Sequence, residues 1–283
     1  GGIYESDHFY AECDRLGIMV WQDFMMACGW YPQTDEFAAA LEAEVRQVVR
    51  DLRSHPCMAL WAGDNECDMA VDWMKPPMKA AENRLTREVL RRACRELDPA
   101  VPYLPSSPWS PSGAHWSVQT EGDLHCYTHG QDYRTSDLWK AKCRFMSEFG
   151  RLSLPSMKVI RKYFPKGTEW PLTNAMWRHH GSDTTRTRMF RVTDKILDEL
   201  KACGKPEPAN IREAVKASQE LHAEGVVALI EHYCADPEFG GFLLWNVADC
   251  WPQQSDAVTD CDGNPKPVFR KLGPLFRAVR RAR

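Results

Sequence analysis

This sequence of 283 residues lacks the patterns of several common protein classes. No apolar run approaches the roughly 20 residues that a helix needs to cross a bilayer, so no membrane partner is expected. The formal net charge is only -3 and the basic residues are scattered, which argues against a nucleic-acid partner. There is also no glycine-rich phosphate loop and no Gly-x-Ser-x-Gly nucleophile elbow. The function therefore has to be sought in other residues.

The eleven cysteines form neither a C-x-x-C pair nor a zinc-like cluster. Cys57, Cys126 and Cys143 lie in or beside strand-like runs, where cysteine usually acts as a small buried hydrophobe. We interpret most of the cysteines as free thiols, which favours a reducing, cytoplasmic compartment. His125 and His129 are four apart, but they fall at a strand end and in a loop, so their spacing gives no shared face. We expect neither a metal nor a cofactor.

Short apolar runs alternate with amphipathic segments along the chain. The spacing of apolar residues predicts helices at 7–16, about 34–53, about 82–95 and 211–233. The runs that predict strands are 18–22, 58–61, 102–104, 124–127, 144–148 and 241–245. Strands separated by helices predict an α/β fold with a parallel sheet and helices outside it.

The number of predicted strands bears on the architecture. A (β/α)8 TIM barrel has eight strands and typically about 250 residues. An open barrel of six strands would expose two unpaired strand edges, which native proteins avoid. The simplest account is that residues 1–283 form a partial TIM barrel with strands three to eight present and the first two strands missing. A complete doubly wound α/β domain is the alternative.

Two glutamates each end one of the strand-like runs. Glu66 ends the run 59–66, which continues past the strand predicted at 58–61, and Glu148 ends the run 144–148. In an alternating strand/helix protein, the end of a strand delivers its side chain to the catalytic face. A pair of carboxylates delivered in this way, one to give a proton and one to attack, is the equipment of a retaining glycosidase. We therefore expect the two carboxyl groups to face each other across one sugar-sized gap.

Short stretches spread over the whole chain carry a resemblance to a known family. They are 1–5, 13–18, 20–24, 52–56, 60–61 with 63 and 65–66, 147–150, 244–246 and 249–252. With Asn65-Glu66 and Ser147-Glu148-Phe149-Gly150 as the most specific pair, the sequence resembles glycoside hydrolase family 2, most closely its β-mannosidase-like branch. The resemblance implies a TIM-barrel catalytic domain whose usual N-terminal β-sandwich domains and first two barrel strands are absent from this chain.

The resemblance also implies roles for the two glutamates and their neighbours. Glu66 would be the acid/base and Glu148 the nucleophile, while Asn65 would hydrogen-bond the sugar 2-hydroxyl. Asp64 departs from the Asn-Asn-Glu that mannosidases commonly show. Its carboxylate either raises the pKa of the acid/base by like-charge repulsion or points away from it.

Three further residues match positions that contact the substrate or the nucleophile in the family. Tyr127 would touch the nucleophile, with a buried core tyrosine as the alternative reading. Trp245 would form a floor or wall of the sugar subsite, and Asp23 would bind sugar hydroxyls.

These residues predict a retaining exo-β-glycosidase of mannosidase type that acts on a carbohydrate substrate without a cofactor. β-Galactosidase, β-glucuronidase and exo-glucosaminidase specificities are alternatives within the same chemistry. A non-catalytic carbohydrate-binding remnant is another alternative, as is a fragment that completes its barrel by pairing with the missing N-terminal part.

Overall fold

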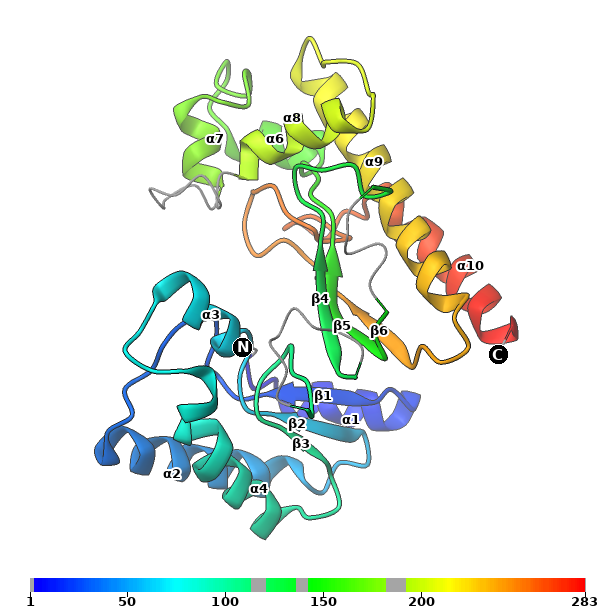
Figure 1. The fold of residues 1–283 in the computed structure, drawn as a ribbon. Helices are drawn as coiled ribbons and strands as arrows, with labels where there is room; N and C mark the ends of the chain where they lie inside the picture. Colours follow the sequence, from blue (N-terminus) through cyan, green and yellow to red (C-terminus); the bar gives the residue numbers. More distant parts are fainter. Residues whose placement is uncertain (1–2, 113–120, 136–141, 182–191, 283) are drawn as a thin grey trace. The chain divides into compact units, whose positions relative to one another are not determined.

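The computed structural model describes residues 3–112, 121–135, 142–181 and 192–282. The chain divides into two compact units, Gly1–Leu124 and His125–Arg283, which are called unit 1 and unit 2 below (Figure 1).

Unit 1 alternates helices and strands. In chain order its elements are α1 (Asp7–Leu16), β1 (Val20–Asp23), α2 (Asp35–Leu52), β2 (Met58–Ala62), α3 (Cys67–Met74), η1 (Ala80–Glu82), η2 (Leu85–Leu90), α4 (Arg91–Leu97) and β3 (Tyr103–Leu104). The three strands form a parallel sheet in the order β1-β2-β3. Asp23 pairs with Ala62, so the ends of β1 and β2 lie side by side.

Local sequence explains the boundaries of the two best-predicted helices. The α1 helix ends at Gly17, whose φ of 66° suits a residue without a Cβ. The α2 helix begins after Thr34, whose side chain accepts a hydrogen bond from the Phe37 amide. Its apolar stripe is buried in the core of unit 1 and comprises Ala38, Leu41, Val45, Val48, Val49 and Leu52.

Unit 2 contains the second sheet and the long helices. Its elements, with β4 starting at the end of unit 1, are β4 (Asp123–Tyr127), β5 (Phe145–Gly150), α6 (Met157–Tyr163), α7 (Ala175–His180), α8 (Val192–Ala202), α9 (Ile211–Cys234), β6 (Gly241–Leu244) and α10 (Pro267–Ala282). The strand order is β4-β5-β6, and β5 and β6 are parallel. The α9 and α10 helices pack along each other (Figure 1). A separate core gathers around Trp177, Leu172, Ile196 and Leu200.

All six predicted strands are present within about two residues of their predicted bounds, and the α/β class is confirmed. The structure divides these strands between two three-stranded sheets, and it shows no complete barrel among the residues that it describes. The helix predicted over about 82–95 is less regular than its spacing suggested, because it passes from a 3-10 turn through a π-helical segment into α4. In the described parts of the chain, no helix combines the length and the apolar character that membrane crossing requires.

Candidate active site

Glu66 lies in the turn that links β2 to α3. Its backbone has φ 60° and ψ 14°, the left-handed region, which costs a residue with a Cβ about 1–2 kcal/mol. Such a conformation persists only where its surroundings hold it. The Glu66 amide donates to the Ser107 carbonyl at 2.7 Å, and the Asn65 amide donates to the Met26 carbonyl at 2.9 Å. The turn is therefore fixed from two sides by segments that follow β1 and β3.

Gly63 allows this turn to sit close to the segment after β3. A Cβ at this position would lie 2.4 Å from the Pro105 carbonyl oxygen and 2.5 Å from the Tyr103 hydroxyl oxygen. The Tyr103 hydroxyl in turn donates to the Thr86 carbonyl at 2.6 Å. The glycine in Gly63-Asp64-Asn65-Glu66 is thus required by a close approach of two segments.

Cys28 lies beside both predicted site residues of this turn. Its thiol donates to Oε2 of Glu66 at 3.4 Å, and the Asn65 side-chain amide donates to the same sulfur at 3.7 Å. The Cys28 amide also donates to the Asn65 carbonyl at 2.8 Å. Sequence reasoning missed this residue, because a lone cysteine in a loop carries no distinctive pattern.

The structure shows which way the Asp64 carboxyl points. Its side chain is fully buried and points into unit 1, where Oδ1 accepts hydrogen bonds from the Ser106 hydroxyl and the Cys67 amide. Burial, with Asp68 as a second cause, raises the pKa of Asp64 to about 7. The reading in which this carboxyl points away is the one that fits.

Asp23 occupies the last position of β1. Its Oδ1 accepts a hydrogen bond from the indole nitrogen of Trp21 at 2.9 Å. The residue is partly buried, and its register partner Ala62 lies four positions before Glu66. Contact of Asp23 with sugar hydroxyls stays a prediction.

Glu148 sits inside β5 and contacts a histidine on the neighbouring strand. His125 Nδ1 and Glu148 Oε2 are 2.9 Å apart, and the two side chains are only 2% and 10% exposed. An ionised Glu148 would accept this hydrogen bond from the Nδ1–H of the imidazole. The structure therefore holds the predicted nucleophile in a fixed, largely dehydrated position.

His125 contacts the predicted nucleophile, and sequence reasoning did not predict this contact. Its four-residue spacing to His129 bears only on a metal pair. The informative spacing is to Tyr127, because residues two apart on a strand face the same side. The Tyr127 ring lies 5.0 Å from that of His129, centroid to centroid. The predicted contact of Tyr127 with the nucleophile stays a prediction.

Trp245 follows β6 and is tied to the end of β5. Its backbone amide donates to the Phe149 carbonyl at 2.9 Å. A Cβ on Gly150 would lie 2.6 Å from the Trp245 carbonyl oxygen and 2.5 Å from the Asp256 Cβ, so glycine is required there. The Trp245 side chain is exposed, at 45%, and an exposed indole can serve as a platform for a sugar face.

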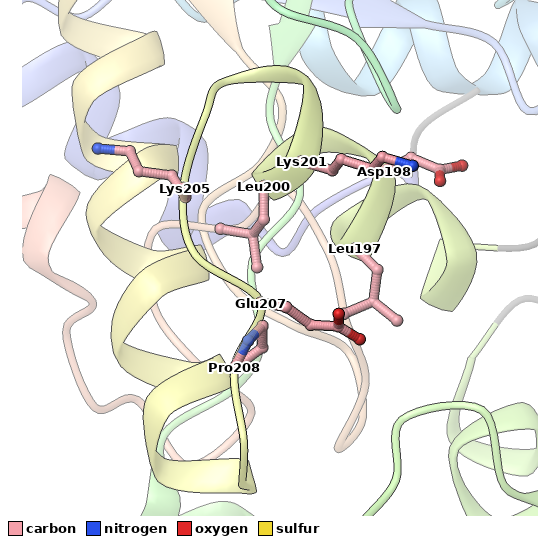
Figure 2. A pocket seen from close by; sticks show the side chains of 7 residues that line it. All are labelled: Leu197, Asp198, Leu200, Lys201, Lys205, Glu207 and Pro208. Carbon is pink, nitrogen blue, oxygen red and sulfur yellow. The ribbon is translucent and has the colours of Figure 1, made fainter.

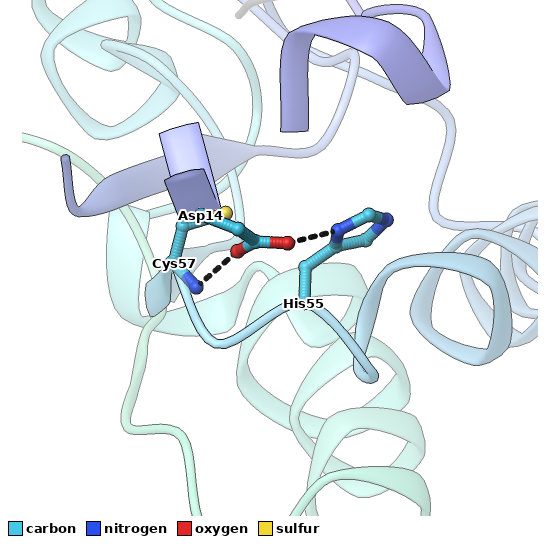
Figure 3. A group of neighbouring side chains, drawn as sticks. All are labelled: Asp14, His55 and Cys57. Atoms are coloured by element: carbon cyan, nitrogen blue, oxygen red, sulfur yellow. Dashed lines mark hydrogen bonds and ion pairs between the residues drawn. The ribbon is translucent and has the colours of Figure 1, made fainter. Parts of the chain in front are cut away.

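Asp14, His55 and Cys57 form a compact cluster of potential metal ligands in unit 1 (Figure 3). Asp14 Oδ2 lies 2.7 Å from His55 Nδ1, and Asp14 Oδ1 accepts from the Cys57 amide at 2.8 Å. Burial raises the pKa of the Cys57 thiol to about 12, so it stays neutral. Both carboxylate oxygens already connect α1 to the start of β2, which is a structural task.

Unit 2 also has a surface pocket of about 340 Å³ at the end of α8 (Figure 2). It is lined by Leu197, Asp198, Leu200, Lys201, Lys205, Glu207 and Pro208. None of these seven residues is a predicted site residue, and their charges are mixed.

Known proteins with similar sequences show what the chain as a whole resembles. The chain is 31% identical to "Beta-mannosidase B" of Emericella nidulans over 308 residues, which cover 99% of this chain and 35% of that protein. It is 29% identical to the protein of the same name from Thermothelomyces thermophilus, with the same two coverages. The chain thus spans about a third of the length of these relatives.

Solved structures give the same result. The β-D-mannosidase from Dictyoglomus thermophilum has a TM-score of 0.86 and 32% identity, over 98% of this chain and 34% of that one. The exo-chitosanase of Amycolatopsis orientalis, at a TM-score of 0.64 and 15% identity over 95% of this chain and 32% of that chain, shows a shared fold alone. No protein-family model matches the chain.

These relatives establish the class to which the chain is similar, that of the glycoside hydrolases. More narrowly, the resemblance to the β-mannosidase-like branch of glycoside hydrolase family 2 is confirmed.

Proposed function

We propose that residues 1–283 belong to the catalytic domain of a retaining exo-β-mannosidase. In this proposal the six strands are strands three to eight of a (β/α)8 barrel, and the first two strands come from sequence outside this chain. The substrate is a terminal β-linked mannoside, and no cofactor takes part. The similarity to β-mannosidases over 99% of the chain supports the substrate class.

The observation that carries the proposal is the environment of Glu148. A buried carboxyl beside an imidazole at 2.9 Å is held in one position and is shielded from water. In a double displacement, this carboxylate attacks the anomeric carbon while the leaving oxygen departs. The sugar is then bound to Glu148 as an ester. The carboxylate stabilises the positive charge that develops at the anomeric carbon in the transition states before and after this intermediate.

Glu66 supplies the proton chemistry in the proposal. It donates a proton to the leaving oxygen in the first step and accepts one from the attacking water in the second. Asn65, beside it, hydrogen-bonds the sugar 2-hydroxyl. Tyr127 aims the nucleophile, Trp245 packs against the sugar ring and Asp23 binds its hydroxyls.

Labelling with a mechanism-based fluorosugar tests the proposal. The intact protein is incubated with a 2-fluoro-β-mannosyl fluoride, and the labelled peptide is identified by mass spectrometry. Esterification of Glu148, together with β-configured mannose as the first-formed product, is expected. Label on another residue, or inversion at the anomeric carbon, would contradict the assignment.

A panel of 4-nitrophenyl β-glycosides tests the sugar. We expect the mannoside to give the highest kcat/KM among mannoside, galactoside, glucuronide and glucosaminide. A higher value for any of the other three would transfer the assignment to that specificity while keeping the mechanism. Sugar binding without labelling or turnover would identify a non-catalytic carbohydrate-binding protein instead.

A further inference from the structure

Asp64 is the one fully buried carboxyl in the turn that carries Glu66. Its Oδ1 accepts from the Ser106 hydroxyl at 2.5 Å and from the Cys67 amide at 3.1 Å. Within the described residues, its Oδ2 is buried and has no hydrogen-bond partner. A carboxyl that uses a single oxygen twice acts as a connector between the two groups that it accepts from.

The two groups that Asp64 connects lie on either side of Glu66. Cys67 is the first residue of α3 and directly follows Glu66. Ser106 directly precedes Ser107, whose carbonyl accepts from the Glu66 amide at 2.7 Å and whose amide donates to the Asp64 carbonyl at 3.0 Å. Removing the Asp64 side chain would therefore loosen both attachments of a residue that has a strained backbone.

We propose that Asp64 is a positioning residue for the acid/base, and that its buried carboxyl holds Glu66 at positive φ by tying the start of α3 to the segment after β3. The inference rests on the proposed function, because it concerns how Glu66 is aimed at a leaving oxygen. A general acid acts only within hydrogen-bond reach of the atom it protonates. A small displacement of the Glu66 backbone therefore slows the step in which the leaving oxygen is protonated.

The charged and titratable groups around Asp64 come from three elements. Burial, and then Asp68 on α3, raise its pKa to about 7, while the hydrogen bonds from Ser106 and Cys67 and the charge of Arg87 on η2 oppose the rise. The phenol of Tyr103 on β3 also interacts with it. Near neutral pH, a substantial fraction of Asp64 is uncharged. Its acceptor oxygen then matters more than its charge, and an asparagine oxygen can replace it.

The test measures how activity depends on the leaving group. Asp64→Ala, Asp64→Asn and Ser106→Ala are made in the intact protein and assayed with 2,4-dinitrophenyl β-mannoside and β-1,4-mannobiose. The first has a leaving group that needs little protonation, and the second needs it fully. For Asp64→Ala, we expect kcat/KM on mannobiose to fall at least about tenfold more than on the aryl mannoside. Asp64→Asn should recover most of the loss, and Ser106→Ala should show a smaller loss with the same preference.

Asp68→Asn provides the matched control. Asp68 is a nearby, largely buried carboxyl whose partner is Arg87 at 2.5 Å, and no hydrogen bond described here ties it to the segment after β3. Its loss should lower both activities equally. An equal fall on both substrates in Asp64→Ala, or in Ser106→Ala if the first variant does not fold, would overturn the positioning role. Failure of the wild type to hydrolyse either substrate would instead contradict the proposed function.

Discussion

The two predicted catalytic glutamates are held in different ways. Glu66 lies in a turn after β2, partly exposed and at positive φ, and main-chain contacts from two other segments fix it. Glu148 lies inside β5, buried, where the pairing with β6 shifts register between Met146 and Phe149, and its side chain contacts His125. In the proposed mechanism, the nucleophile attacks along one line, which suits a buried side chain held by a neighbouring strand. The acid/base must exchange protons with two different groups, which suits a more accessible turn.

Among these variants, Glu148→Gln should cause the largest loss of activity. The amide keeps the shape and can still accept a hydrogen bond from His125, but it cannot form the glycosyl ester. We expect turnover of 4-nitrophenyl β-mannoside to fall by more than about 10⁴-fold, as when other covalent nucleophiles are removed. Circular dichroism should be unchanged. Retention of the wild-type rate would remove Glu148 from the mechanism.

Glu66→Ala should give a loss whose size depends on the substrate. Losing the general acid should cost roughly 10²–10⁴-fold on substrates with poor leaving groups. Substrates with activated aryl groups should lose much less in kcat/KM. The measurement is a series of aryl β-mannosides of graded leaving-group acidity. A uniform loss across the series, like that of Glu148→Gln, would contradict a separate acid/base role for Glu66.

His125→Ala tests whether Glu148 needs its contact with the His125 imidazole to stay in position. Without the imidazole, the Glu148 carboxyl can shift, and a misplaced reacting group can cost about 10²-fold in kcat. His125→Asn is the control, because its side-chain amide can donate from nearly the position of Nδ1. We expect it to retain more activity than His125→Ala in the same steady-state assay. Equal activity of wild type and His125→Ala would show that the strand alone fixes Glu148.

Gly63→Ala and Gly150→Ala test the packing at the two sites. Each new Cβ would lie within 2.6 Å of a backbone carbonyl oxygen, and such overpacking costs about 1–3 kcal/mol of unfolding free energy. Gly273→Ala in α10 is the control. Among the described residues its Cβ would meet the Arg277 guanidinium at 3.6 Å, so no comparable overpacking is expected there. Urea unfolding measures all three, and a neutral result at 63 or 150 would refute the close approach there.

The last test concerns the pH dependence of stability in unit 1. The pKa of Asp64 is about 7 in the folded protein, above its ordinary value of 3.8 in the unfolded chain. The folded state therefore holds this proton more tightly, so the stabilisation is complete below pH 3.8 and is lost as pH rises through 7.

Asp64→Asn should remove that slope. The difference in unfolding free energy between wild type and variant should change by up to about 1.4 kcal/mol per pH unit between pH 4 and 7. Above pH 7, this difference in unfolding free energy should no longer change with pH. Urea unfolding at several pH values measures it, and parallel curves would contradict a protonated, buried Asp64.

The sequence predicted the elements well because most of their signals are local. The α1 helix has its predicted bounds, 7–16, since an amphipathic stripe and Gly17 define them. Glu66 lies in the turn four residues after β2 and Glu148 two residues before the end of β5, so the apolar runs located both only to within a few residues of a strand end. Such features depend on residues within a few positions of one another.

The features that were missed depend on residues far apart in the chain. Asp64 accepts a hydrogen bond from Ser106, 42 positions later, and no residue close to Asp64 in the sequence indicates that partner. His125 and Glu148 meet only because β4 and β5 are neighbours in one sheet. The π-helical segment at Leu85–Leu90 was also not predictable, since its apolar spacing resembles that of an ordinary helix.

The sulfur of Cys28 has a practical consequence. An exposed thiol 3.4 Å from a carboxyl oxygen of Glu66 is open to peroxide, which converts cysteine first to a sulfenic and then to a sulfinic acid. A sulfinate would be a permanent anion next to the acid/base and would strengthen the hold of Glu66 on its proton. Under the proposed function, protein stored without a reductant should therefore show the pH optimum of its glycosidase activity drifting to alkaline values as it ages.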